Sequence, residues 1–330
     1  MISTAKHPSV RLEDLFARTK LMCFGRYAVE LPEQTEQIMG FQQIAGGFKQ
    51  FSMATYKEPG QLLQAEWAKA ASESKTAEIV TPITAGPVPG AKYFWFYDVG
   101  YAKRNDVRLL DGAIPIGPRL YLYEGMASKN ERLSPEDLFR RMSDLMRGMR
   151  AWDGASVPHE PGVCIDGAFI HEPTHRFQEI MSSGFVFPSL PDVHFSVMSN
   201  KNASTEADNG KGLLERVDKA RRDQLFYPYT FLRRGKRTLH GLWDGEEVLA
   251  RRSDGALQFD WELVGQTGNV ARPPWLEVNF RTRVADNKVG AALYSALSDE
   301  QAVALWDRLL ENIKFRVAVP GATPQSVALG

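Results

Sequence analysis

The sequence contains little cysteine and no long apolar run. Only two of its 330 residues are cysteines, Cys23 and Cys164, too few for a disulfide framework or for a zinc site built from cysteines. Two interpretations of the pair remain open: one disulfide in an oxidising compartment, or two small buried thiols. No stretch of about 18 apolar residues is present, so the sequence predicts no membrane-spanning segment.

Net charge is absent as well, because forty basic and forty acidic side chains cancel. A neutral chain has no overall attraction for nucleic acid or anionic lipid, which argues against a nucleic-acid-binding protein. Residues 1–16 lack the apolar segment of a signal peptide, so the chain is either cytoplasmic or an exported protein without its leader. Hydrophobic residues at 43% and charged residues at 24% are typical of a folded protein with one large or two ordinary domains.

Internal similarity is the most informative feature that the sequence does have. The segment "CFGRYAVELP" (23–32) aligns without a gap with "CIDGAFIHEP" (164–173), so that cysteine meets cysteine and proline meets proline. Further along, "QFSMATYKE" (50–58) resembles "HFSVMSNKN" (194–202), with the alternation of a β-strand in both.

The similarity continues in the same order along both halves. A helical pattern follows at 60–75 in the first half and at 210–224 in the second. The aromatic, strand-like segment "YFWFYDVG" (93–100) then resembles "LQFDWELVG" (257–265).

Each half closes with an amphipathic helix, which begins near Leu133 in the first half and near Leu297 in the second. Ser134 and Ser298 are the predicted N-caps, and Ser298 with Gln301 has the spacing of a capping box. Apolar residues recur at intervals of three and four in both segments, which indicates one buried helical face.

We therefore predict an α+β fold with two related domains that arose by internal duplication. Each domain is expected to be an antiparallel β-sheet packed with helices. The Gly- and Pro-rich segment 151–163 is the predicted junction, which gives domains at 1–152 and 153–330.

Residues His171, Glu172 and His175 spell H-E-x-x-H, the motif of zinc metallopeptidases. In those enzymes both histidines lie on one helical face and bind zinc, while the glutamate acts as general base. Pro173 disfavours a helix here, and the aligned segment "RYAVELP" alternates as a strand that ends at a proline. We predict a strand end followed by a turn, and no metal-ligating or catalytic residue.

Other catalytic patterns are missing or weak. Neither a G-x-S-x-G nucleophile elbow nor a Walker loop occurs. The acidic segment 244–248 is predicted to be a solvated turn, and the basic run "RRGKR" (233–237) a hairpin turn, with a phosphate or headgroup patch as its functional alternative. We predict a protein that is not an enzyme and needs no cofactor. The alternative is a hydrolase with a site in the cleft between the domains.

Four segments together resemble the two-domain immunity proteins that are paired with type VI secretion lipase effectors: "CFGRYAVELP", "GVCIDGAFI", "LPDVHFSVMS" and "LSDEQAVALWDRLLENIKFR". The resemblance runs from about residue 20 to about residue 317 and includes the domain order. It implies a protein that binds a cognate phospholipase effector, clamps it between the two domains and so protects the producing cell. It also implies a periplasmic location with the export signal removed from this chain, and the cytoplasm is the alternative.

Effector contacts are expected where the two halves differ, because the shared scaffold is committed to the fold. The segments that differ are 102–108, 200–212 and 233–237. Within them, the predicted effector-binding residues are Arg104, Asp106, Arg233 and Arg234.

Overall fold

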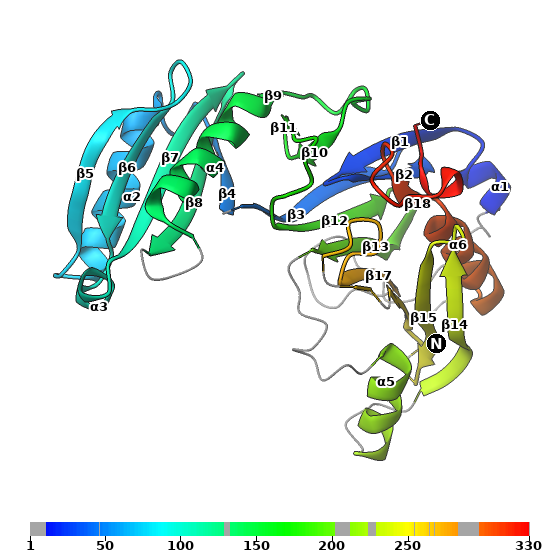
Figure 1. Ribbon diagram of the computed structural model, residues 1–330. Helices are drawn as coiled ribbons and strands as arrows, with labels where there is room; N and C mark the ends of the chain where they lie inside the picture. Colours follow the sequence, from blue (N-terminus) through cyan, green and yellow to red (C-terminus); the bar gives the residue numbers. More distant parts are fainter. Residues whose placement is uncertain are drawn as a thin grey trace, which may run out of the picture. The chain divides into compact units, whose positions relative to one another are not determined.

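The computed structural model describes residues 11–45, 47–128, 133–201, 212–223, 229–253, 255–263, 265–266, 268–282 and 297–329. By their contacts, residues 1–41 and 180–330 form one compact unit, here called unit 1, and residues 42–179 form unit 2 (Figure 1). Antiparallel sheets with a few helices make up both units, which confirms the α+β prediction. The predicted boundary between residues 152 and 153 rests on sequence similarity and stays a prediction, since the contacts divide the chain at other places.

The main sheet of unit 2 has the strand order β4-β8-β7-β6-β5, with every neighbouring pair antiparallel. Its strands are β4 (Gly47–Ser52), β5 (Glu78–Ala85), β6 (Lys92–Tyr97), β7 (Val107–Ile116) and β8 (Arg119–Ser128). Its helices are α2 (Pro59–Glu73), α3 (Gly100–Arg104) and α4 (Pro135–Gly148).

Helices α2 and α4 cover opposite faces of this sheet. Successive residues of a strand point to opposite faces of the sheet. Leu120 and Leu122 of β8 pack with Leu62 of α2, and the side chain between them, Tyr121, points to the face that α4 covers. On the α4 face, a Cβ atom at Gly112 of β7 would overlap the sulfur of Met142. The glycine therefore permits the close approach of α4 to the sheet.

The main sheet of unit 1 has the order β14-β15-β16-β17-β13-β12, with β3 next to β12. Its strands are β3 (Glu36–Ile44), β12 (Glu179–Phe187), β13 (Leu190–Asn200), β14 (Tyr229–Leu239), β15 (Trp243–Arg252), β16 (Leu257–Leu263) and β17 (Trp275–Thr282). Its helices are α1 (Leu12–Leu15), α5 (Leu213–Arg222), α6 (Asp299–Glu311) and the 3₁₀ turn η1 (Pro324–Ser326).

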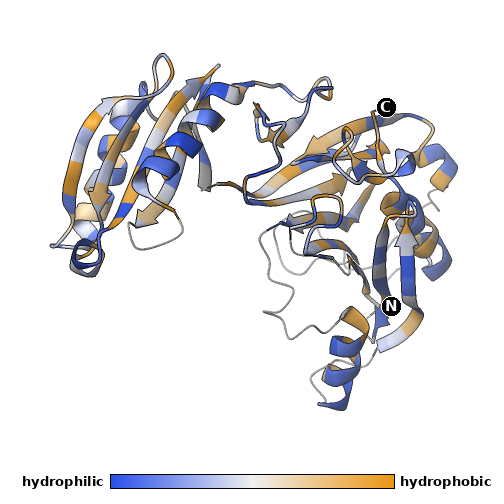
Figure 2. Cartoon of the chain, viewed as in Figure 1, coloured by the Kyte–Doolittle hydropathy of each residue, from blue (hydrophilic) through white to orange (hydrophobic). Residues whose placement is uncertain are grey.

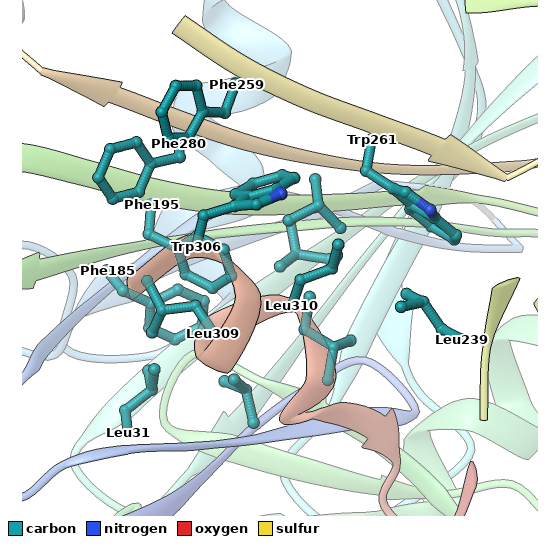
Figure 3. Close-up of a cluster of buried hydrophobic side chains, with 14 of the residues drawn as sticks. Leu31, Phe185, Phe195, Leu239, Phe259, Trp261, Phe280, Trp306, Leu309 and Leu310 are labelled. Atoms are coloured by element: carbon teal, nitrogen blue, oxygen red, sulfur yellow. The ribbon is translucent and has the colours of Figure 1, made fainter. Parts of the chain in front are cut away.

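Helix α6 supplies the centre of the core of unit 1 (Figure 3). Trp306 is fully buried and meets the rings of Phe259 and Phe280 edge-on, at centroid distances of 6.0 and 6.5 Å. The helix begins with the predicted capping box: Ser298 Oγ accepts from the Gln301 amide at 3.2 Å, and the Gln301 side chain accepts from the Ser298 amide at 2.9 Å.

Each unit also contains a small three-stranded antiparallel sheet. In unit 1 it consists of β1 (Thr19–Phe24), β2 (Tyr27–Pro32) and β18 (Ile313–Phe315), and in unit 2 of β9 (Met149–Ala151), β10 (Gly162–Ile165) and β11 (Ala168–His171). The two hairpins have the same register, because Cys23 pairs with Ala28 and Cys164 pairs with Phe169.

Both cysteines are disulfide-bonded and neither is a free thiol, so the interpretation as two buried thiols is wrong. In the part of the chain that the structure describes, no helix combines the length and apolarity needed to cross a bilayer.

Candidate functional site

The H-E-x-x-H residues form a turn after a strand. Strand β11 ends at His171, and residues 172–176 are not helical. The carboxylate of Glu172, only 3% exposed, accepts hydrogen bonds from the amides of Thr174 and His175, both at 3.0 Å. The prediction of a strand end and turn is confirmed, and the carboxylate of Glu172 stabilises this turn through its hydrogen bonds. Within the described residues, no group of three or more His, Cys, Asp or Glu side chains is placed to hold a metal ion.

Two predicted contact residues, Arg104 and Asp106, lie at one end of the sheet of unit 2. Arg104 is the last residue of α3; its side chain is exposed and forms no ion pair with any described residue. Asp106 is part-buried and accepts from Tyr97 Oη at 2.7 Å and from Arg108 Nε at 2.8 Å. Arg104 therefore has no ion-pair partner among the described residues, whereas the charge of Asp106 is neutralised within unit 2.

Arg233 and its neighbour Arg237 belong to an ion-pair network that holds α6 on the sheet of unit 1. Glu247 of β15, 4% exposed, accepts from Arg233 Nε at 2.6 Å and from Arg237 at 3.2 Å. Asp307 of α6 accepts from Arg233 at 3.0 Å, and its hydrogen bond is the main cause that raises the pKa of Arg233. The prediction of a solvated turn at 244–248 is wrong, because the whole segment lies within β15 and the carboxylate of Glu247 is buried against two guanidinium groups.

The predicted hairpin turn at 233–237 is also wrong. These residues lie in the interior of β14, and the turn follows at His240, where φ is 55°. Successive side chains of β14 reach opposite helices: Arg233 contacts α6, whereas Arg234 donates to both carboxylate oxygens of Asp218 on α5, at 2.9 and 3.0 Å. Both arginines thus have intramolecular partners, and their role in effector binding stays a prediction. In the predicted contact segment 200–212, residues 202–211 lie outside the described residues.

Exposed apolar side chains gather at one edge of unit 2, on β5 and at the start of α3. Strand β5 pairs only with β6 among the described strands, and Figure 2 shows apolar positions along it. An ion pair between Lys103 and Glu78, together with a hydrogen bond of 2.7 Å from the Gly100 amide to Thr76 Oγ1, holds α3 beside the start of β5. The exposed apolar residues are Ile79, Val80, Val99 and Tyr101.

We call these four residues with Arg104 the β5–α3 surface. Pro82 in β5 removes one backbone donor from the outer edge, as is typical of edge strands. Tyr101 is 67% exposed, and exposed tyrosine and arginine are the residue types that supply much of the binding energy at protein interfaces. The surface therefore has the composition of a protein-binding site.

A pocket of about 560 Å³ lies in unit 2, lined by residues of α2, β7, β8 and α4. We call it the acidic pocket, because its lining contains five carboxyl groups and only two basic side chains. The carboxyl groups are Glu66, Glu73, Asp98, Asp111 and Glu124, and the basic side chains are Lys69 and Arg141.

Asp111 is the most deeply placed acid of this pocket. It is 5% exposed, and its carboxyl accepts no hydrogen bond from any described residue. Burial, together with the negative charges of Glu124 and Glu66, raises the pKa of Asp111 to about 8, against a smaller opposing effect of Lys49. Asp111 was not predicted from the sequence, although a single acid within the apolar strand "VRLLDGAIPI" is the signal that could have indicated it.

The chain was compared with known proteins. Residues 156–318 match the family model of the Tle cognate immunity protein 4 C-terminal domain, which confirms the resemblance to immunity proteins over this half of the chain. No curated protein matches the chain in sequence.

Two solved structures share the fold. One is the apo immunity protein TplEi of the type VI secretion system of Pseudomonas aeruginosa, with 23% identity, a TM-score of 0.67, and coverage of 90% of this chain and 97% of that chain. The other belongs to the crystal structure of the Tle4–Tli4 complex, with 23% identity, a TM-score of 0.68 and the same coverage.

Proposed function

We propose that this chain is an immunity protein which binds and inhibits a cognate type VI secretion lipase effector. The proposal proceeds from the match of residues 156–318 to the Tle cognate immunity protein 4 C-terminal domain. The family match is the observation that carries the proposal. It is supported by a fold shared over 90% of the chain with a structure of the Tle4–Tli4 complex. Each molecule of this protein inhibits one molecule of the lipase by binding it, without catalysing a reaction, and this inhibition protects the producing cell.

The alternative of a hydrolase has no support. Its only candidate residues were those of the H-E-x-x-H letters, and Glu172 is engaged by two backbone amides of its own turn. We infer that the chain acts by binding alone, so that its work is done by an interface.

The β5–α3 surface is our first candidate for contact with the effector. It combines exposed apolar side chains with Arg104, which has no intramolecular partner among the described residues. For Asp106, Arg233 and Arg234, effector contact would have to coexist with the ion pairs that these residues make within their units. A clamp formed by two domains remains a prediction that the resemblance implies.

We further propose that the chain arose by internal duplication. The order of neighbouring strands from β12 is β12-β13-β17-β16-β15-β14, and from β3 it is β3-β4-β8-β7-β6-β5. A helix follows β13 and β4 along the chain, and another follows β17 and β8, which supports the proposal, although α3 of the first half has no counterpart between β15 and β16. In this correspondence β6 takes the position of β15, and the sequence match of 93–100 with 257–265 is displaced by one strand.

The duplicated halves have exchanged their opening hairpins. The closing strand of the second half, β18, pairs with β2 of the first half, with Ile313 opposite Val29. The closing strand of the first half, β9, pairs with β11 of the second half in the same register, with Met149 opposite Ile170. This reciprocal exchange accounts for units that divide near residues 41 and 179, while the repeat itself divides near residue 152.

A periplasmic location belongs to the same proposal. Both cysteines are disulfide-bonded, and disulfides persist in oxidising compartments such as the periplasm. The cytoplasm would keep two such residues reduced.

Co-expression with a candidate lipase effector from the same organism tests the function. We expect a stable one-to-one complex on size-exclusion chromatography and loss of lipase activity once the immunity protein is equimolar. Replacing Tyr101 and Arg104 together by Ala should weaken inhibition, whereas the matched exposed pair Arg140 and Arg147 on α4 should tolerate the same change. A lipase that neither associates with the wild-type protein nor loses activity would overturn the proposal.

A further inference from the structure

We propose that the acidic pocket of unit 2 receives a lysine or arginine side chain of the partner lipase, with the carboxylate of Asp111 as its ion-pair partner. The inference rests on the proposed function for the identity of the partner. It adds a specific recognition site that adjoins the β5–α3 surface, since Asp98 of the pocket directly precedes Val99.

The first reason is that Asp111 has no partner of its own. Buried carboxyl groups in folded proteins are nearly always hydrogen-bonded or paired, because removing them from water is costly. Asp111 is only 5% exposed and lines the pocket. Its carboxyl group accepts no hydrogen bond from any described residue. A donor brought in by a partner would satisfy it.

The second reason is the sign of the charges that surround Asp111. The charged side chains around Asp111 belong to several elements: Glu66, Lys69 and Glu73 to α2, Glu124 to β8, Lys49 to β4 and Arg141 to α4. Asp98 lies just after β6. Lys49, whose charge opposes the rise in the pKa of Asp111, already donates to Glu124 at 2.7 Å. The remaining charge in the pocket is negative and favours a cationic ligand.

The third reason is the shape and polarity of the walls, which suit a long basic side chain better than a bare metal ion. A divalent cation needs several oxygen ligands that converge on one point, and no such group exists among the described residues. Apolar side chains line the pocket together with the acids and would contact the aliphatic part of lysine or arginine. They include Phe96, Leu109 and Met126, of which Met126 is 57% exposed.

Proton release on binding follows from this arrangement. Free Asp111 is largely protonated at neutral pH, since its pKa lies near 8, whereas a bound ammonium or guanidinium group favours the ionised form. Affinity for the lipase should therefore rise as pH increases from about 6 to about 8.

The test compares two neutral variants in binding to the purified lipase. Asp111→Asn removes the buried charge and keeps the volume, and Asp153→Asn makes the same change at an exposed carboxylate outside the pocket. We expect Asp111→Asn to raise the Kd by about tenfold to a hundredfold and to abolish its pH dependence, while Asp153→Asn changes the Kd by less than about threefold.

A second measurement needs no variant. Calorimetry of the wild-type pair at pH 7, in two buffers of different ionisation enthalpy, should report release of close to one proton. Equal affinities of Asp111→Asn and wild type, or binding without proton release, would overturn the pocket assignment and leave the proposed function standing. Failure of the wild-type protein to bind the lipase would instead overturn both.

Discussion

Asp111 and Glu247 are both buried acids within strands, yet only Glu247 accepts hydrogen bonds from described residues of its own unit. Glu247 accepts from two arginines of the adjacent strand β14, whereas Asp111 accepts from no described residue. Neither environment was predicted from the sequence. An acid in a strand gives no indication of which cations the fold brings to it, because strand register and the packing of neighbouring elements decide which side chains meet.

Replacement of Asp111 should make the protein more stable at high pH. The pKa of Asp111 in the folded state, about 8, lies above the ordinary value of 3.8, so the folded state binds the extra proton. Its contribution is then fully present at low pH and is lost as pH rises from about 4 through about 8. Asp111→Asn does not titrate, so its free energy of unfolding relative to wild type should be higher at pH 9 than at pH 5, by roughly 4 kcal/mol for about three pH units of titration. Urea denaturation at the two pH values measures this, and a constant difference would contradict it.

At the scale of elements, helices were predicted well where their signals are local. Ser134 and Ser298 cap α4 and α6 as expected, and the segments 23–32 and 164–173 form hairpins of the same register. Segment 233–237 was misassigned, because a run of charge is normally solvated. The acids that neutralise it stand on β15 and α6, and their proximity depends on tertiary structure that a local pattern does not contain.

The network of β14, β15 and α6 should account for a large part of the docking of α6. Glu247→Gln leaves Arg233 and Arg237 with a weaker acceptor at a buried position and should lower the free energy of unfolding by about 2–4 kcal/mol. Glu311→Gln is the matched control, because Glu311 accepts from the same Arg237 but its side chain is 56% exposed. We expect a loss of at most about 0.5–1 kcal/mol there. Equal losses on chemical denaturation would mean that burial of the acid is unimportant.

At the scale of the whole molecule, the similarity in the sequence predicted two related halves, but not that the closing strand of each half pairs with the opening hairpin of the other. Similarity shows which segments are equivalent, and it does not show which of two equivalent partners a strand will pair with. Strand β18 could in principle pair with β11 or with β2, whose aligned residues are of the same apolar kind, and the structure pairs it with β2.

Separate halves should therefore fail to fold on their own. Fragment 1–152 lacks β10 and β11, the partners of β9, and fragment 153–330 lacks β1 and β2, the partners of β18. We expect each fragment alone to lack a cooperative thermal transition by circular dichroism, and the two co-expressed fragments to associate and recover one. A cooperative transition of fragment 1–152 by itself would show that the hairpin exchange is dispensable.

The pairing of Val29 with Ile313 also determines when unit 1 can complete its folding during synthesis of the chain. Proteins are synthesised at about 5–20 residues per second, so the first hairpin leaves the ribosome roughly 15–60 s before the strand that completes its sheet. Unit 1 cannot close while the chain is still being translated, and until then the hairpin exposes apolar residues such as Val29, which the folded structure buries completely. During that interval the chain remains a substrate for chaperones and for export machinery that accepts only unfolded polypeptides.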